Sequence, residues 1–186
     1  KKIFKKVKYP TPKKYDDGID LLQEKIEELT NFSIPKIITI GFDGVIDQVK
    51  GRVEKSPNNP NWVGHSVRQE LTHRLHTRIE LENDAALGGL GEAHSKGRKK
   101  YEILAYITLS TGVGGVRIVD GKIDYHAIPF EPGHQILDPN GRFWPGCGEK
   151  GCFEALGSGR AFEIEYGVKP ENCEDYKIWE EHARIV

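Results

Sequence analysis

Two adjacent polar residues, Asn83 and Asp84, stand between an expected short strand at residues 79–81 and an expected helix of small residues from 85 to about 93. Asn and Asp are preferred as helix caps, so capping is the first interpretation of the pair. A helix N-terminus also favours the ionised form of an Asp carboxylate. Such a carboxylate can accept a proton from a hydroxyl group within hydrogen-bond reach. Both roles can coexist if Asn83 caps the helix and Asp84 points outward.

A glycine-rich stretch, residues 110–115, lies between two expected strands at 103–109 and 116–119. Glycines allow the backbone to approach a ligand closely and to direct N–H groups at an anion, and two hydroxyls add further donors. No Lys-Ser/Thr pair follows and the next element is a strand, so the stretch is neither a P-loop nor a dinucleotide fingerprint. A tight hairpin is the alternative interpretation. The candidate anion-binding residues are Ser110, Thr111, Gly112, Gly114 and Gly115.

A carboxylate and an imidazole, Glu131 and His134, are separated by Pro-Gly and can converge on one ligand across that turn. A surface turn is the alternative. Cys147 and Cys152 follow, and with His134 their thiolates could ligate zinc. Three ligands fall short of the four of a closed structural site, and two buried free thiols are an equally good interpretation.

The rest of the chain must supply the elements that position these residues. Apolar residues at helical spacing predict a helix over 18–30, preceded by an Asp-Asp cap. A β-branched run at 37–40 predicts a buried strand. Ser66 and Gln69 have capping-box spacing before a second helix. We further expect a hairpin at 49–53, a loop at 57–61, a two-residue hairpin turn at Asp120-Gly121, and C-terminal helices at 158–166 and 174–184.

Two units are expected along the chain. Helices and strands alternate before residue 97, whereas hairpins dominate afterwards. We therefore expect a small α/β lobe over residues 1–97 and the first part of a larger α/β lobe over residues 98–186, with the boundary near Gly97. The second lobe would hold the glycine-rich stretch and the two neighbouring cysteines.

The composition excludes several classes of protein. Charged residues are 30% of the 186 residues and the net charge is −1, so we expect neither nucleic acid nor an anionic membrane as a partner. The longest uncharged run, residues 103–116, is too short for a membrane-spanning helix. Three cysteines do not make a disulfide framework, which favours a reducing, cytoplasmic setting. The chain contains no Met, even at position 1, and we expect it not to begin at a natural start.

In their order and spacing, these stretches resemble the repressor–ORF–kinase (ROK) family of bacterial sugar kinases and sugar-responsive repressors. The family's Glu-Asn-Asp before a small-residue helix corresponds to residues 82–87. Its Gly-Thr-Gly-x-Gly-Gly turn corresponds to residues 110–115, with Ser110 in place of the first Gly. Its Glu-x-Gly-His corresponds to residues 131–134, and its Cys-x-Cys-Gly-x-x-Gly-Cys-x-Glu to residues 145–154. The resemblance covers roughly residues 10–166.

The resemblance implies a glucokinase-like sugar kinase with the actin-like ATPase (ribonuclease H-like) fold, an α/β fold of two lobes that is incomplete in this chain. It implies ATP and Mg²⁺ as cofactors, a hexose as substrate and, for a full-length protein, a homodimer. Asp84 would be the general base, and the turn at 110–115 would approach the phosphates of ATP. The sugar hydroxyls would be bound by Asn83, Glu131, His134 and Glu154.

The sequence departs from the family pattern in several places. The family's opening strand and its Asp-x-Gly-Gly-Thr phosphate loop are not found in residues 1–36, and the family's second half is missing, so we expect this fragment alone to be inactive or nearly so. Pro145 stands at the position of the first zinc cysteine. Zn²⁺ would then have His134, Cys147 and Cys152 as ligands, with water or another side chain as the fourth. Asp43 replaces a proline that is usual in the family's Gly-x-Pro-Gly turn.

The alternative to a kinase is a non-catalytic sugar-binding module, as in the family's transcriptional repressors, and a truncated relative that binds nothing well is a third hypothesis. An Asp-x-Gly-Gly-Thr loop upstream would favour the kinase, whereas a winged helix-turn-helix upstream would favour the repressor. Glucose is the simplest hexose to expect. Mannose, fructose, N-acetylmannosamine and N-acetylglucosamine also suit a polar cluster of this kind.

Overall fold

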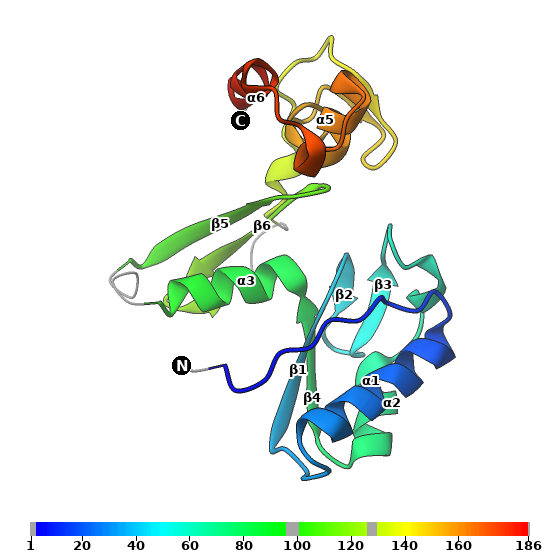
Figure 1. Cartoon of the computed structure of the whole chain (residues 1–186). Helices are drawn as coiled ribbons and strands as arrows, with labels where there is room; N and C mark the ends of the chain where they lie inside the picture. Colours follow the sequence, from blue (N-terminus) through cyan, green and yellow to red (C-terminus); the bar gives the residue numbers. More distant parts are fainter. Residues whose placement is uncertain (1–2, 96–100, 126–129, 186) are drawn as a thin grey trace. The chain divides into compact units, whose positions relative to one another are not determined.

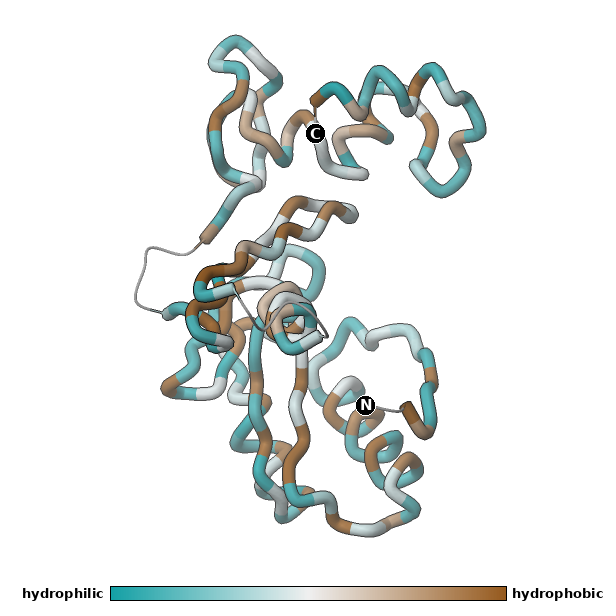
Figure 2. The backbone as a smooth tube through the Cα atoms, turned by 90° about the vertical axis from the view of Figure 1, so that its left-hand side faces the viewer, coloured by the Kyte–Doolittle hydropathy of each residue, from teal (hydrophilic) through white to brown (hydrophobic). Residues whose placement is uncertain are grey.

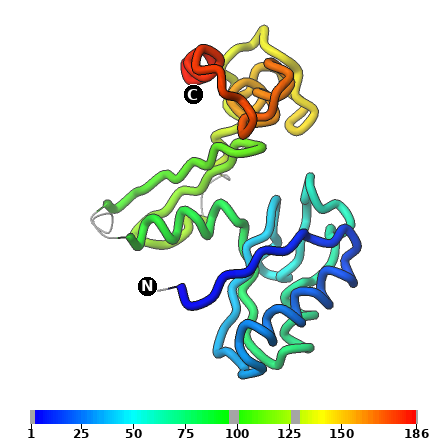
Figure 3. Tube along the Cα trace, in the orientation of Figure 1, coloured from blue at the N-terminus to red at the C-terminus, as the bar shows by residue number. Residues whose placement is uncertain are grey.

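Contacts within the chain divide it into two compact units, Lys1–Asp84 and Ala85–Val186. Figure 3 traces both in chain order. The boundary that we predict near Gly97 lies outside the described residues, while the contacts divide the chain after Asp84. The computed structural model describes residues 3–95, 101–125 and 130–185 (Figure 1).

The first unit combines two helices with a pair of parallel strands. Strands β1 and β4 pair in parallel, with Phe42 opposite Asn83, while β2 and β3 form an antiparallel hairpin. Parallel neighbours need a crossover connection, which the hairpin, a 3₁₀ turn and a helix supply. The elements are α1 (Tyr15–Leu29), β1 (Ile37–Phe42), β2 (Val45–Asp47), β3 (Arg52–Lys55), η1 (Pro60–Trp62), α2 (Val67–Leu75) and β4 (Arg78–Asn83).

Trp62 lies at the centre of this unit's core and is 1% exposed. Its indole Nε1 donates to the Pro12 carbonyl at 3.3 Å, and the Tyr15 ring packs against it edge-on. A β-carbon at Gly18 would lie 2.1 Å from the Trp62 ring, so α1 approaches the ring closely only because this residue is glycine. Apolar residues recur along α1 at helical spacing, as packing of one helix face requires; Figure 2 colours the backbone by hydropathy. Other core residues are Ile19, Val53, Val67, Leu71 and Leu81.

Three local predictions for the first unit need correction. The capping box at Ser66 is wrong, because the Ser66 hydroxyl donates to the Lys50 carbonyl at 3.0 Å and so ties α2 to the β2–β3 hairpin. Helix α1 begins at Tyr15, so the two aspartates lie in its first turn, where their charges complement the helix dipole. Strand β1 was expected to be buried, but alternate residues are exposed, Ile37 by 50%.

The second unit packs a helix on a three-stranded antiparallel sheet of order β5–β6–β7, followed by short elements. Within the described ranges, none of the helices combines the length and apolar character that a membrane crossing requires. The elements are α3 (Asp84–Ala93), β5 (Ile103–Leu109), β6 (Val113–Val119), β7 (Lys122–Ile123), η2 (Pro132–His134), β8 (Phe143–Trp144), β9 (Glu149–Lys150), α4 (Phe153–Gly157), α5 (Gly159–Tyr166), η3 (Pro170–Asn172) and α6 (Tyr176–Ala183).

Two turns of this sheet were predicted from sequence. The Asp120-Gly121 turn is confirmed, and both residues have positive φ angles, 49° and 75°, as a type I′ turn requires. The glycine-rich turn is shorter than predicted. Strand β6 begins at Val113, so Gly114 and Gly115 are strand residues opposite Thr108 and Ile107 of β5.

Gly89 and Gly91 offer a matched test of how α3 packs. A β-carbon at Gly89 would lie 2.3 Å from Cγ1 of Val116, whereas one at Gly91 would have no described neighbour within 4 Å. We predict that Gly89→Ala lowers the free energy of unfolding by about 1–3 kcal/mol through overpacking. Gly91→Ala should raise it by about 0.5–1 kcal/mol, because Ala favours the helix. Urea unfolding followed by circular dichroism measures both, and equal effects at the two positions would contradict this packing of α3 on β6.

Candidate active site

The carboxyl ends of β1 and β4 lie side by side, because Phe42 and Asn83 are opposite each other in the parallel pair. Ligands of α/β proteins bind at this edge of a parallel sheet. Asp43 directly follows β1, and Asp84 directly follows β4. Two carboxylate-bearing residues therefore leave adjacent strands at the same edge.

Asn83 links the end of β4 to the turn after β1. Its side-chain Nδ2 donates to the Gly44 carbonyl at 2.9 Å, and its backbone N–H donates to Oε1 of Glu82 at 2.7 Å. The side chain that we expected to cap the following helix thus holds the neighbouring turn. The hydrogen bond to Gly44 fixes Asn83 at the end of the strand, and this bond could not be predicted from the sequence.

Asp84 is the first residue of α3, a helix of 10 residues, and its side chain is exposed. The N-terminus of a helix attracts negative charge, and a carboxylate can accept a proton from a hydroxyl group within hydrogen-bond reach. An exposed carboxylate at the carboxyl edge of a parallel strand pair can meet a hydroxyl group of a ligand. This arrangement suits the general-base role predicted for Asp84, which stays a prediction.

Glu154, in the first turn of α4, joins two other parts of the second unit. Its Oε2 accepts the backbone N–H of Val113 at 2.9 Å, and its Oε1 accepts the indole Nε1–H of Trp144 at 2.7 Å. The carboxylate is therefore fixed between the start of β6 and β8. Each carboxylate oxygen can accept two hydrogen bonds, so both oxygens retain capacity for a ligand hydroxyl.

Glu131 directly precedes η2, and His134 is its last residue. Gly133, between them, is buried, and a β-carbon there would lie 2.3 Å from the Val113 carbonyl oxygen. The η2 turn thus packs directly on the first residue of β6, whose N–H is bonded to Glu154. The structure brings the segments of three predicted sugar-binding residues together at Val113, and leaves the side chains of Glu131 and His134 exposed.

The turn between β5 and β6 is fastened to α5. The Gly159 N–H donates to the Ser110 carbonyl at 2.8 Å, and the Arg160 N–H donates to the Thr111 carbonyl at 3.1 Å. Ser110 and Thr111 are exposed. Gly115 has a packing reason to be glycine, because a β-carbon there would lie 2.8 Å from Pro132.

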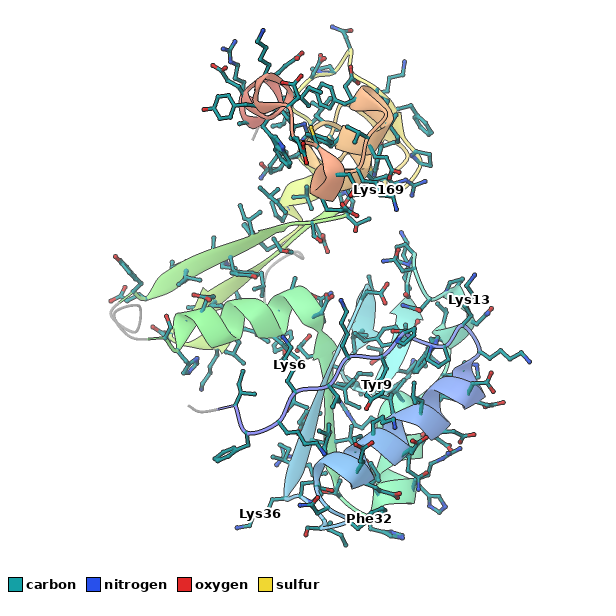
Figure 4. All side chains as sticks on the ribbon, in the orientation of Figure 1. Lys6, Tyr9, Lys13, Phe32, Lys36 and Lys169 are labelled. Carbon is teal, nitrogen blue, oxygen red and sulfur yellow. The ribbon has the colours of Figure 1, made fainter. Side chains whose placement is uncertain are left out.

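A pocket of about 640 Å³ adjoins this turn, and sequence reasoning did not find it. Its lining includes two basic side chains, Arg160 and Lys169, and two acidic ones, Glu163 and Glu171. Figure 4 labels Lys169, in the segment after α5. Trp179 and His182 line it from α6, along with the Ser110-Thr111 turn. A partly aromatic pocket whose basic and acidic side chains balance, beside backbone that can approach an anion, suits the aromatic part of a phosphorylated ligand.

The predicted zinc ligands are only partly brought together. The Cys147 and Cys152 sulfur atoms lie 3.3 Å apart, and both are free thiols. Burial raises the pKa of the Cys152 thiol, with a further rise from its hydrogen bond to Cys147. Among the residues that the structure describes, no three His, Cys, Asp or Glu side chains gather as a metal site. His134 does not join the two thiols, so this arrangement does not fit a bound zinc ion.

Sequence comparison finds relatives over most of the chain. A family model described as "ROK family" matches residues 1–184. A protein named glucokinase from Thermotoga maritima is 34% identical over 164 residues, covering 86% of this chain and 51% of the relative. A protein named N-acetyl-D-glucosamine kinase from Yersinia pestis is 31% identical over 170 residues, covering 84% of this chain and 66% of the relative. The chain spans about half the length of the Thermotoga relative.

Two similar solved structures are also named as sugar kinases of the ROK family. A ROK hexokinase from Thermus thermophilus superposes with a TM-score of 0.78 at 29% identity, covering 95% of this chain and 63% of that one. A ROK family glucokinase from Streptomyces griseus, solved with glucose and AMPPNP, gives a TM-score of 0.68 at 27% identity and covers 83% and 49%. The predicted α/β, actin-like ATPase fold is thereby confirmed for the part of that fold present in the chain.

The Trp144–Glu154 hydrogen bond generates a stability prediction. Trp144→Phe should lower the free energy of unfolding by about 1–3 kcal/mol, because a partly buried carboxylate oxygen loses its indole donor. The control is Trp179→Phe, whose indole donates to the Cys173 carbonyl at 3.0 Å near the surface and whose loss should cost less than about 1 kcal/mol. Urea unfolding of the two variants checks this. A loss at Trp144 no larger than at Trp179 would mean that this bond does not hold Glu154.

Proposed function

Because the chain belongs to the ROK family, we propose that it carries the acceptor side of a sugar kinase that transfers the γ-phosphoryl group of ATP to a hydroxyl group of a hexose. The position of Asp84 carries this proposal: an exposed carboxylate begins α3 directly after a parallel strand, in a chain whose relatives are named as sugar kinases. Glucose is the simplest acceptor, and N-acetylglucosamine is the next to test. A cytoplasmic location would supply the ATP.

Asp84 is the general base in this proposal. The attacking hydroxyl oxygen forms a bond to the γ-phosphorus, the bond from phosphorus to the leaving ADP oxygen breaks, and the hydroxyl proton passes to the Asp84 carboxylate. Mg²⁺ arrives with ATP and neutralises phosphate charge. Asn83 binds the sugar beside Asp84 while its amide also holds the Gly44 carbonyl.

Glu131, His134 and Glu154 bind further sugar hydroxyls in this proposal. A hexose presents many hydroxyl groups, each of which can donate to a carboxylate oxygen. Glu154 is held by two hydrogen bonds to the chain, so it would meet the sugar without first losing side-chain freedom. The proximity of η2 and Glu154 at Val113 supports a shared ligand for these residues.

The ATP phosphates meet the Ser110–Gly112 part of the glycine-rich turn, and the adjoining pocket takes part of the nucleotide. The exposed residues Ser110 and Thr111 support this placement. In the adjoining pocket, Arg160 and Lys169 offer positive charge beside the carboxylates of Glu163 and Glu171. Gly115 also lets β6 and η2 pack closely, because a β-carbon there would lie 2.8 Å from Pro132. A full-length protein would act as a homodimer.

We predict that Asp84→Asn in the full-length protein lowers kcat by about 10²–10⁴-fold, because the general base is lost. Sugar affinity should stay within about threefold, because an amide of the same shape still hydrogen-bonds a hydroxyl. A coupled ADP-release assay over a hexose panel measures kcat, and calorimetric titration measures sugar affinity. Asp120→Asn, in the hairpin turn after β6, is the control and should leave both unchanged.

Three results would contradict this assignment. Undiminished turnover in Asp84→Asn would place the base elsewhere. Equal loss of turnover and sugar binding would make Asp84 a structural residue. Wild-type protein that binds a hexose but never releases ADP would favour a sugar-binding module of the repressor type.

A further inference from the structure

We propose that Asp43 is a positioning residue for sugar binding: its carboxylate fastens the segment 56–59 at the carboxyl edge of β1 and β4, and thereby sets the affinity for the sugar. This inference rests on the proposed function, since it assigns a role within the same acceptor site. It concerns a residue for which the resemblance to the ROK family supplies no role, because a proline usually stands at this position.

The Asp43 carboxylate gathers three donors from one short segment. Its Oδ2 accepts the Ser56 hydroxyl at 2.7 Å and the Asn58 amide at 3.3 Å, and its Oδ1 accepts the Asn59 amide at 2.7 Å. Ser56 is 4% exposed, and its hydroxyl oxygen also accepts the Asn59 backbone N–H at 3.0 Å. These bonds form a closed network around one negatively charged group.

Apart from the Asp43 network, the segment is held at its end, where the Asn59 carbonyl accepts the Trp62 N–H at 3.0 Å. It lies between the end of β3 and η1, and residues 56–59 belong to neither a strand nor a helix. Hydrogen bonds to an ionised acceptor are stronger than neutral ones, so a single aspartate can replace the support that a strand or helix would give. A proline at position 43 would offer no side-chain acceptor.

The network lies at the edge where we place the sugar. Asp43 comes one residue after Phe42, which is opposite Asn83 in the parallel pair. The Asn83 amide donates to the carbonyl of Gly44, the residue after Asp43. Gly44 has a φ of 94°, and a β-carbon there would lie 2.0 Å from the Lys55 carbonyl oxygen. The turn after β1 is therefore in direct contact with both Asn83 and the residue that precedes Ser56.

A loop that is already ordered binds a ligand more tightly than one that must be ordered on binding. Loss of the Asp43 carboxylate should free segment 56–59 and weaken sugar binding, while Asp84 keeps its place at the start of α3. The sugar KM should rise, whereas kcat and the ATP KM should change little. That division separates a positioning role from a general loss of stability.

The experiment compares full-length wild type with Asp43→Ala, Asp43→Asn and the control Asp47→Ala. Asp47, at the end of β2, interacts with its own turn: it accepts the N–H groups of Val49 and Lys50, and the Lys50 ammonium lies 3.4 Å from its Oδ2. Asp43→Ala should raise the sugar KM about tenfold or more, because the segment loses its hydrogen bonds to a charged acceptor. Asp43→Asn keeps one acceptor oxygen and should recover part of that loss. In all variants kcat and the ATP KM should stay within about twofold.

Amide hydrogen exchange supplies a second measurement. Exchange at the amides of residues 56, 58 and 59 should quicken in Asp43→Ala and stay at the wild-type rate in Asp47→Ala. An active wild type with an unchanged sugar KM in Asp43→Ala overturns the Asp43 assignment alone. The same conclusion follows if exchange is unchanged, or if Asp47→Ala raises the sugar KM equally. A wild type that phosphorylates no hexose and binds none overturns the proposed function, and the sugar role of Asp43 with it.

Discussion

The second unit depends on the placement of one carboxylate. Glu154 receives a backbone N–H from β6 and an indole N–H from β8, and so joins segments that are far apart in the sequence. The neighbouring glycines follow from this placement: a β-carbon at Gly112 would lie 2.8 Å from Oε2 of Glu154, and one at Gly133 would strike the Val113 carbonyl. Small residues surround the carboxylate because its hydrogen bonds require the backbone to come close.

The first unit is organised by a different constraint, the register of two parallel strands. Because Phe42 lies opposite Asn83, the residues that follow each strand emerge at one edge. Polar groups there satisfy one another: the Asn83 amide bonds the Gly44 carbonyl, and the Asp43 carboxylate bonds three side chains. The charged residue Asp43 thus serves the fold at the edge where we propose that the sugar binds.

Local pattern predicted the elements of this chain better than the partners of its polar side chains. The helices and the Asp120-Gly121 turn follow from short-range spacing and from the positive φ that glycine allows, and these were confirmed. Ser66 has capping-box spacing, yet its hydroxyl bonds a carbonyl of a hairpin that is near only in the folded chain. The bond from Trp144 to Glu154 and the pocket near Lys169 likewise depend on tertiary packing. The motif residues could be predicted because each motif is contiguous in sequence. The residues that hold them in place are distant in sequence and could not be predicted.

The start of α5 limits how an anion can be held beside it. A helix N-terminus ordinarily offers unpaired N–H groups to a phosphate. Here the first three N–H groups already have acceptors: the carbonyls of Ser110 and Thr111, and the Ser158 hydroxyl at 3.0 Å from the Ala161 nitrogen. In the adjoining pocket, Arg160 and Lys169 share the lining with the carboxylates of Glu163 and Glu171, so an anion must bind close to one of the cations and away from the carboxylates. Side-chain charges near the surface are screened by dissolved ions, so occupancy of this pocket will be sensitive to ionic strength.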